Sequence, residues 1–459
     1  MTSPSAEARH LWTASFVGPF VLLAMAAAMG VGVQSFARPI GVICALFMVA
    51  SLTWYSPSRA TSVALVMLFV TPFLSVVPGL KPDQVNFGAF YGLAMVPVAL
   101  VICARTRRFV FDSGAVLLAA ILLSALVTLL AGEALVTGYS YLVWPITTLA
   151  VYLLVLNASK NSHTWLLALI LSFSLIEALL GISQSLFKWP VFTLTIPTLL
   201  ETNRGLLGYV VPGFSRMVAN GSGTFWHFNL LGSLLALSLP ICFGWLLESP
   251  RSFRRLLSFA ILATGLLTSY SRGGWVGGAV GCIVVYWASR PRTSRPWAPL
   301  LSAGVLLMAT LSAPYISAYY GATQNVSSRI ATWRYAFSYW LQHAERIPFG
   351  TGFGSFQQTI LMQRFSLGDQ TLPSLHSGLL QILLEMGIAG LLLFGWFLIT
   401  TIRPFAGDRR PEWQVWALGG ILGLLVSQLF DNALFVVTGT CAFALAACLR
   451  RADSRHETG

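Results

Sequence analysis

Long apolar runs separated by short polar or charged breaks cover most of the chain. A helix needs roughly 20 residues to cross the hydrocarbon core of a bilayer, which is about 30 Å thick. Several runs are shorter, so some pairs are expected to be re-entrant or half-spanning. The pattern predicts an all-α polytopic membrane protein with about 12 (12–14) transmembrane helices. The candidate runs are 13–33, 39–55, 60–79, 89–104, 113–132, 142–157, 164–186, 227–248, 256–271, 274–289, 298–315, 377–402, 413–430 and 434–449.

Composition favours a single integral membrane domain over residues 1–459. Hydrophobic residues make up 56% of the chain and charged residues only 9%, against about 25% charged residues in soluble domains. A soluble enzyme, a disordered chain and a nucleic-acid-binding domain are thereby excluded, because so much apolar surface must face lipid. The net charge of +13 is assigned to loops that orient the chain in the membrane, not to nucleic acid.

The basic residues predict how the chain is oriented. Counted over alternate connections from the N-terminus, 18 Arg and Lys lie on one side and 10 on the other. Because basic loops stay in the cytoplasm, both termini are predicted to be cytoplasmic. The long connections 188–226 and 315–376 then lie on the outer side, and the second is expected to carry a helix over 327–342 on the outer membrane surface.

Arg272 stands at a tight turn between two apolar runs, within Ser271-Arg272-Gly273-Gly274-Trp275. An arginine at the outer membrane face is costly unless it has an anionic partner, and the glycines let a ligand or another backbone approach closely. Arg272 is therefore a candidate anion-binding residue. The alternative is a snorkelling anchor, although such arginines lie mainly in the cytoplasmic loops of this chain.

His376 lies where the second long connection enters an apolar run. Ser374 is the expected N-cap, which would place His376 in the first helical turn. The helix end favours a neutral imidazole and a bound anion, and a neutral imidazole can take a proton from an attacking hydroxyl. The alternative is an interface histidine that bonds a backbone carbonyl.

Arg204 and Arg216 lie in the first long connection, where Glu201 is the only acid near them. Each alone reads as a solvated loop residue. Together with Arg272 they form an arginine set without matching carboxylates, and planar guanidinium groups clamp phosphate oxygens in a two-pronged fashion. The set is what a diphosphate-linked lipid at the outer surface would need.

The acidic residues of the outer side contain no close pair. A Mg²⁺ or Mn²⁺ site usually needs one or two carboxylates beside the substrate phosphates, so the site is predicted to need no metal and no cofactor. Glu177 and Glu385 fall within apolar runs. They are expected to bond inside the helix bundle and not to carry ions.

Several further motifs surround these candidates in a fixed order. They are Arg216, Gly223-Thr224-Phe225 and Asn229; Ser271-Arg272-Gly273-Gly274-Trp275; Arg329-x-x-x-Trp333; Pro348-Phe349-Gly350-Thr351-Gly352-Phe353-Gly354; and His376-Ser377-x-Leu379-x-Gln381-x-x-x-Glu385-x-Gly387-x-x-Gly390. Over about residues 200–400 this pattern resembles the O-antigen ligase and polymerase superfamily. Ser377 departs from it, because many members have asparagine after the histidine.

The resemblance implies the C-type membrane glycosyltransferase fold in a bacterial inner membrane, with 188–226 and 315–376 as periplasmic loops and a periplasmic active site. It implies an inverting glycosyltransferase of lipopolysaccharide biosynthesis. The donor would be an O-antigen glycan on undecaprenyl diphosphate and the acceptor a sugar hydroxyl of lipid A–core. His376 and Arg272 would be catalytic, and Arg204, Arg216 and Arg272 would bind the diphosphate.

Three other functions stay open from the sequence. An O-antigen polymerase would use a second lipid-linked repeat unit as acceptor, and a protein O-oligosaccharyltransferase would use a serine or threonine of a pilin. The ligase is preferred because the second outer loop has a ligase-like size and no domain for a protein acceptor is visible. A flippase for the same lipid would bind the diphosphate with arginines but would need no base.

Overall fold

The computed structural model describes residues 110–131, 135–157, 162–187, 209–210, 217–218, 228–289, 323–354, 375–403, 411–431, 434 and 437–453. The apolar runs before residue 105 and the run 298–315 lie outside this part of the chain, as do both termini. Arg204 and Arg216 also lie outside it. The predicted count of about 12 transmembrane helices therefore stays a prediction.

The described secondary structure is helical apart from one short antiparallel pair, β1 (Tyr209–Val210) and β2 (Met217–Val218). Each predicted apolar run within them is a helix. The helices are α5 (Ser113–Ala131), α6 (Leu135–Asn157), α7 (Ser162–Phe187), α9 (Phe228–Glu248), α10 (Phe253–Thr268), α11 (Arg272–Ala288), α13 (Thr323–Gln342), the 3₁₀ helix η2 (Ala344–Arg346), α15 (Gly378–Ile402), α16 (Glu412–Ser427) and α17 (Val437–Asp453).

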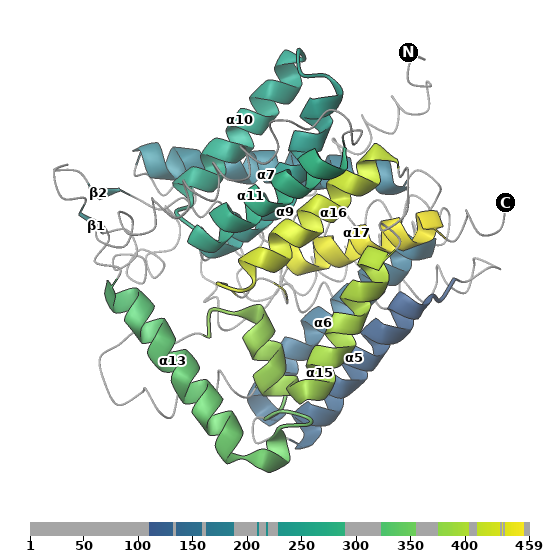
Figure 1. The fold of residues 1–459 in the computed structure, drawn as a ribbon, viewed down its shortest axis with the longest axis vertical. Helices are drawn as coiled ribbons and strands as arrows, with labels where there is room; N and C mark the ends of the chain where they lie inside the picture. The colour runs from purple at the N-terminus through teal and green to yellow at the C-terminus, as the bar shows by residue number, and fades with distance from the viewer. Residues whose placement is uncertain are drawn as a thin grey trace, which may run out of the picture.

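Four of these described helices contain segments long and apolar enough to cross a bilayer: Ser113–Leu130, His163–Leu186, Phe228–Glu248 and Gly378–Ile402. The chain is thus a multi-pass membrane protein. The helix expected over 327–342 is α13, which begins four residues earlier. Figure 1 draws α13 along the edge of the molecule, outside the bundle.

Small residues bring α9, α11 and α16 into close contact at the centre of the bundle, where Figure 1 draws them side by side. A methyl group on Gly277 of α11 would lie 2.2 Å from the carbonyl oxygen of Gly423 in α16. One on Gly274 would lie 2.8 Å from the carbonyl carbon of Gly232 in α9. Glycine at these positions lets backbones pack directly, which is how helices associate where lipid removes the hydrophobic drive. The N-terminus of α11 is thereby fixed against both neighbours.

The ends of the helices fall into two groups, and polar contacts tie each group together. At one end, Asp112 accepts hydrogen bonds from the Nε of Arg450 (2.7 Å) and from the hydroxyl of Tyr152. Arg450 also donates to Thr400 at the C-terminal end of α15. The ring of His163 stacks on Trp413 at the start of α16, with centroids 4.3 Å apart. The opposite end holds the starts of α11 and α15 and the last turn of α16.

Candidate functional site

The turn between α10 and α11 presents Arg272 as the first residue of a helix. Ser271 is the N-cap, and its hydroxyl accepts a hydrogen bond from the backbone N–H of Gly274 at 3.2 Å. Tyr270 precedes it with a φ of 55°, a left-handed conformation that costs a non-glycine residue about 1–2 kcal/mol. The indole of Trp275 donates to the carbonyl of Leu266 and closes the turn. Arg272 itself is half-buried.

His376 lies one residue before the N-cap of α15, and the expected cap at Ser374 is wrong. Ser377 caps the helix instead, because its extended backbone lets its hydroxyl accept from the backbone N–H of Leu380. His376 is half-buried and has a φ of 47°, so it is held in the left-handed region as Tyr270 is. Strained residues of this kind concentrate at binding and catalytic sites.

The turn at the C-terminal end of α16, Ser427–Asp431, joins these two helix starts. The backbone N–H of Gly378 donates to the carbonyl oxygens of Gln428 (3.0 Å) and Asp431 (2.8 Å). On the other side, a methyl group on Gly273 would lie 3.0 Å from the Cβ of Phe430. The residues that follow Arg272 and His376 therefore pack on the same short segment, Ser427–Asp431. The structure brings the two predicted catalytic residues to one corner of the bundle.

Helix α13 covers this corner through the two residues of the Arg329-x-x-x-Trp333 motif. The guanidinium of Arg329 donates to the carbonyl of Phe430 at 3.2 Å. The indole of Trp333 donates to the carbonyl of Leu375 at 2.6 Å. The first bond holds the turn that supports Arg272, and the second holds the backbone next to His376. The motif thus fixes α13 to the backbone on both sides of the site.

Gln428 and Asp431 are site residues that the sequence reasoning did not select. Gln428 is fully buried and Asp431 is 6% exposed. Asp431 stands in the short break between two apolar runs, where a polar residue is ordinary. Asp431 is recognised as a site residue only by its hydrogen bond with Gly378. That contact joins residues more than fifty positions apart, so the sequence does not show it.

The corner is suited to hold an anion beside a base. The N-termini of α11 and α15 carry partial positive charge, and Arg272 adds a full one. His376 lies just before the N-cap of α15, and a neutral imidazole is in general able to accept a proton from a hydroxyl. Within the part of the chain that the structure describes, no three His, Cys, Asp or Glu side chains gather in a way that would hold a metal ion.

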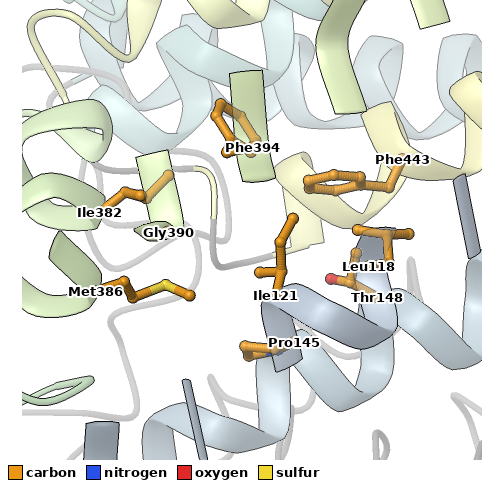
Figure 2. A pocket seen from close by; sticks show the side chains of 9 residues that line it. All are labelled: Leu118, Ile121, Pro145, Thr148, Ile382, Met386, Gly390, Phe394 and Phe443. Atoms are coloured by element: carbon orange, nitrogen blue, oxygen red, sulfur yellow. The ribbon is translucent and has the colours of Figure 1, made fainter. Parts of the chain in front are cut away.

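A separate pocket between α5, α6, α15 and α17 has no such chemistry. Figure 2 shows Ile382, Met386, Gly390 and Phe394 of α15 facing Leu118 and Ile121 of α5, with Pro145, Thr148 and Phe443 completing the lining. The cavity is about 20 Å³ and no ionisable side chain lines it. It is too small and too apolar to receive a sugar or a diphosphate.

Comparison with known families matches a segment that contains most of the corner. Residues 257–395 match the family model described as O-antigen ligase. The resemblance to the O-antigen ligase family is confirmed. The matched segment includes both capped helix starts, the Arg329-x-x-x-Trp333 motif and His376, which is the set that the fold assembles. Comparison with curated proteins found no match for the chain.

Proposed function

We propose that this O-antigen ligase family member transfers a glycan from undecaprenyl diphosphate to a sugar hydroxyl of lipid A–core. The observation that carries the proposal is the corner itself. Arg272 begins α11 and His376 lies just before the N-cap of α15, and both helix starts pack on the turn Ser427–Asp431. A diphosphate-linked donor needs both functions, a cation for the leaving group and a base for the acceptor.

In this mechanism His376 accepts the proton of the acceptor hydroxyl. The hydroxyl attacks the anomeric carbon from the face opposite the diphosphate, so the C–O bond to the diphosphate breaks as the new glycosidic bond forms. An α-linked donor then gives a β-linked product. General-base assistance of this kind typically contributes about 10²–10⁴ in rate.

Arg272 stabilises the departing undecaprenyl diphosphate, whose negative charge grows in the transition state. Its place at the first turn of α11 adds the helix N-terminus to the guanidinium. At least one of Arg204 and Arg216, from the outer connection 188–226, completes the diphosphate site. Arginine in place of a divalent cation makes the transfer independent of metal.

The site faces the periplasm and both termini are cytoplasmic in the proposed orientation. The helix ends support this, because the end opposite the corner holds Arg251, Arg254, Arg255, Arg403, Arg450 and Arg451. Basic residues concentrated at one end of the bundle mark the cytoplasmic side. The bacterial inner membrane is the compartment in which lipid-linked O-antigen and lipid A–core meet.

The decisive experiment is transfer in vitro by purified protein, from undecaprenyl-diphosphate-linked glycan to lipid A–core in excess EDTA. The native chain should form product, while His376→Ala should form none yet bind donor lipid as well as the native chain. A second lipid-linked repeat unit as the preferred acceptor would make the chain a polymerase. No product from the native chain would favour a flippase, and transfer that survives in His376→Ala would rule out His376 as the base.

A further inference from the structure

Helix α15 is two helices joined at a break. Gly387 has φ 68° and ψ −166°, far from helical values, and separates a half-helix Gly378–Met386 from the long half that follows it. Figure 1 shows the change of direction. A break in a membrane helix leaves backbone groups without their helical partners, and each must be satisfied where lipid offers no water.

The glycine-rich connection after η2, residues 347–354, supplies those hydrogen-bond partners. On one side of the break, the backbone N–H groups of Ile388 and Ala389 donate to the carbonyls of Ile347 and Pro348, both at 3.0 Å. On the other side, Thr351 and Gly352 donate to the carbonyls of Leu384 and Glu385, at 2.9 and 3.1 Å. The connection therefore supplies hydrogen-bond partners to the backbone on both sides of the break.

This fit depends on glycine, since the two backbones touch. A methyl group on Gly350 would lie 2.3 Å from the carbonyl carbon of Glu385. One on Gly387 would lie 2.4 Å from the carbonyl oxygen of Pro348. Both glycines have positive φ, so both the conformation and the approach demand them.

Glu385 extends the same junction through its side chain. One of its carboxylate oxygens accepts from the backbone N–H of Gly354 and from the Nε2 of Gln381, both at 2.9 Å. Glu385 is 0% exposed and Gln381 2%. A buried carboxyl is costly unless hydrogen bonds compensate, so this group ties the end of the connection firmly to the half-helix.

Gln381 links Glu385 to the start of the half-helix, next to His376. Gln381 lies one helical turn before Glu385, and its backbone N–H donates to the carbonyl of Ser377, the N-cap. The opposite flank of the half-helix packs against α13, where Ala336, Trp340, Leu375 and Leu384 form a small apolar cluster separate from the main core. The half-helix that follows His376 is thus held by the outer connection as well as by the bundle.

We propose that Glu385 is the positioning residue for His376. Its carboxyl group locks the half-helix and the glycine-rich connection into one unit, which sets where His376 stands relative to Arg272. The inference rests on the proposed function, in which His376 acts on the acceptor. In this role Glu385 acts as a hydrogen-bond acceptor for Gly354 and Gln381 and not on the substrate, so a neutral amide oxygen should replace it.

The test compares three substitutions in the purified full-length chain. Glu385→Leu removes the acceptor for Gly354 and Gln381, and kcat should fall by about 10²-fold, the loss expected from a misplacement of about 1 Å. Glu385→Gln keeps an acceptor oxygen and should retain kcat within about three-fold, because both hydrogen bonds can re-form. Glu345→Gln is the matched control, since that acid lies in η2, just before the glycine-rich connection, with its side chain 68% exposed.

The affinity for the donor lipid distinguishes a positioning role of Glu385 from a general loss of structure. The Kd for undecaprenyl-diphosphate-linked glycan should stay unchanged in Glu385→Leu, because the arginines are untouched. A loss of donor binding parallel to the loss of kcat would reduce Glu385 to a structural residue and overturn the proposal. Equal loss in Glu385→Gln and Glu385→Leu would also overturn it, since the charge would then matter and not the acceptor.

Two further outcomes keep this test distinct from that of the proposed function. If His376→Ala is inactive while well-folded Glu385→Leu has native kcat, the positioning role fails and the ligase proposal stands. If His376→Ala retains full activity, the ligase mechanism fails first. Should Glu385→Leu not accumulate in the membrane, Gln381→Leu removes only the donor on the half-helix. The same fall in kcat supports the proposal, and native kcat refutes it.

Discussion

The break at Gly387 can be tested by one methyl group. Gly387→Ala forces a non-glycine residue to φ 68° and ψ −166°, a region that is essentially restricted to glycine and costs about 1–3 kcal/mol. The same methyl would lie 2.4 Å from the carbonyl oxygen of Pro348, and overpacking of this kind typically costs about 1–3 kcal/mol. We expect the free energy of unfolding to fall by about 2–6 kcal/mol. That is a large share of the stability of most proteins.

Gly395→Ala is the matched control on the same helix. An added methyl at Gly395 would meet no atom within 4 Å, and alanine favours a helix interior over glycine by about 1 kcal/mol. Thermal unfolding in detergent, followed by loss of the monodisperse peak in size-exclusion chromatography, should show Gly387→Ala well below the native chain. Gly395→Ala should lie at or above it. Equal midpoints for Gly387→Ala and the native chain would refute the break and the connection that fills it.

Three shorter predictions address the site, its orientation and the far end of the bundle. Arg272→Lys should restore little of the transfer lost in Arg272→Ala, because a point charge cannot replace the planar fork; near-native turnover in Arg272→Lys would contradict the two-pronged contact. With the native cysteines replaced, Glu345→Cys should react with an impermeant thiol reagent in spheroplasts and Asp453→Cys should not; the reverse pattern would invert the orientation. Asp112→Ala should lower the free energy of unfolding by about 2 kcal/mol, because Arg450 and Tyr152 lose their shared acceptor in a half-buried pair, and unchanged thermal unfolding would contradict this.

The sequence predicts the helices well because lipid imposes a length and a composition on them. A segment such as 113–132 must be apolar along its whole length, so its bounds are visible without any tertiary information. The tight turn before Arg272 is visible for the same reason, since two apolar runs meet there with no room for a loop. Neither result depends on which residues touch.

The break in α15 and the cap at Ser377 could not be read from the sequence, because both are decided by distant residues. Gly387 lies in a continuous apolar run, where a glycine is common, and only the carbonyl of Pro348 beside it shows its role. Ser374 and Ser377 are equally good caps by residue type. The start of α15 is fixed at Gly378 by its bonds to the last turn of α16.

Glu385 was expected to form hydrogen bonds inside the bundle, and it does. The sequence indicates only one of its two donors. An acid within an apolar run predicts an internal hydrogen bond, and the spacing to Gln381 puts an amide one turn away. The second donor, the backbone N–H of Gly354, comes from the outer connection. A pattern in one helix therefore predicted that the acid is bonded, while the structure shows which segments that bond joins.

The site also reaches beyond the segment that matches the family model. Residues 257–395 contain Arg272 and His376, but the turn that brings them together, Ser427–Asp431, lies further along the chain. Two helix starts on separate elements have no fixed relation unless a third element contacts both. The last turn of α16 is that element, because it accepts from Gly378 on one side and packs against Gly273 on the other. The geometry on which transfer would depend is thus a property of the helix bundle and not of the matched segment alone.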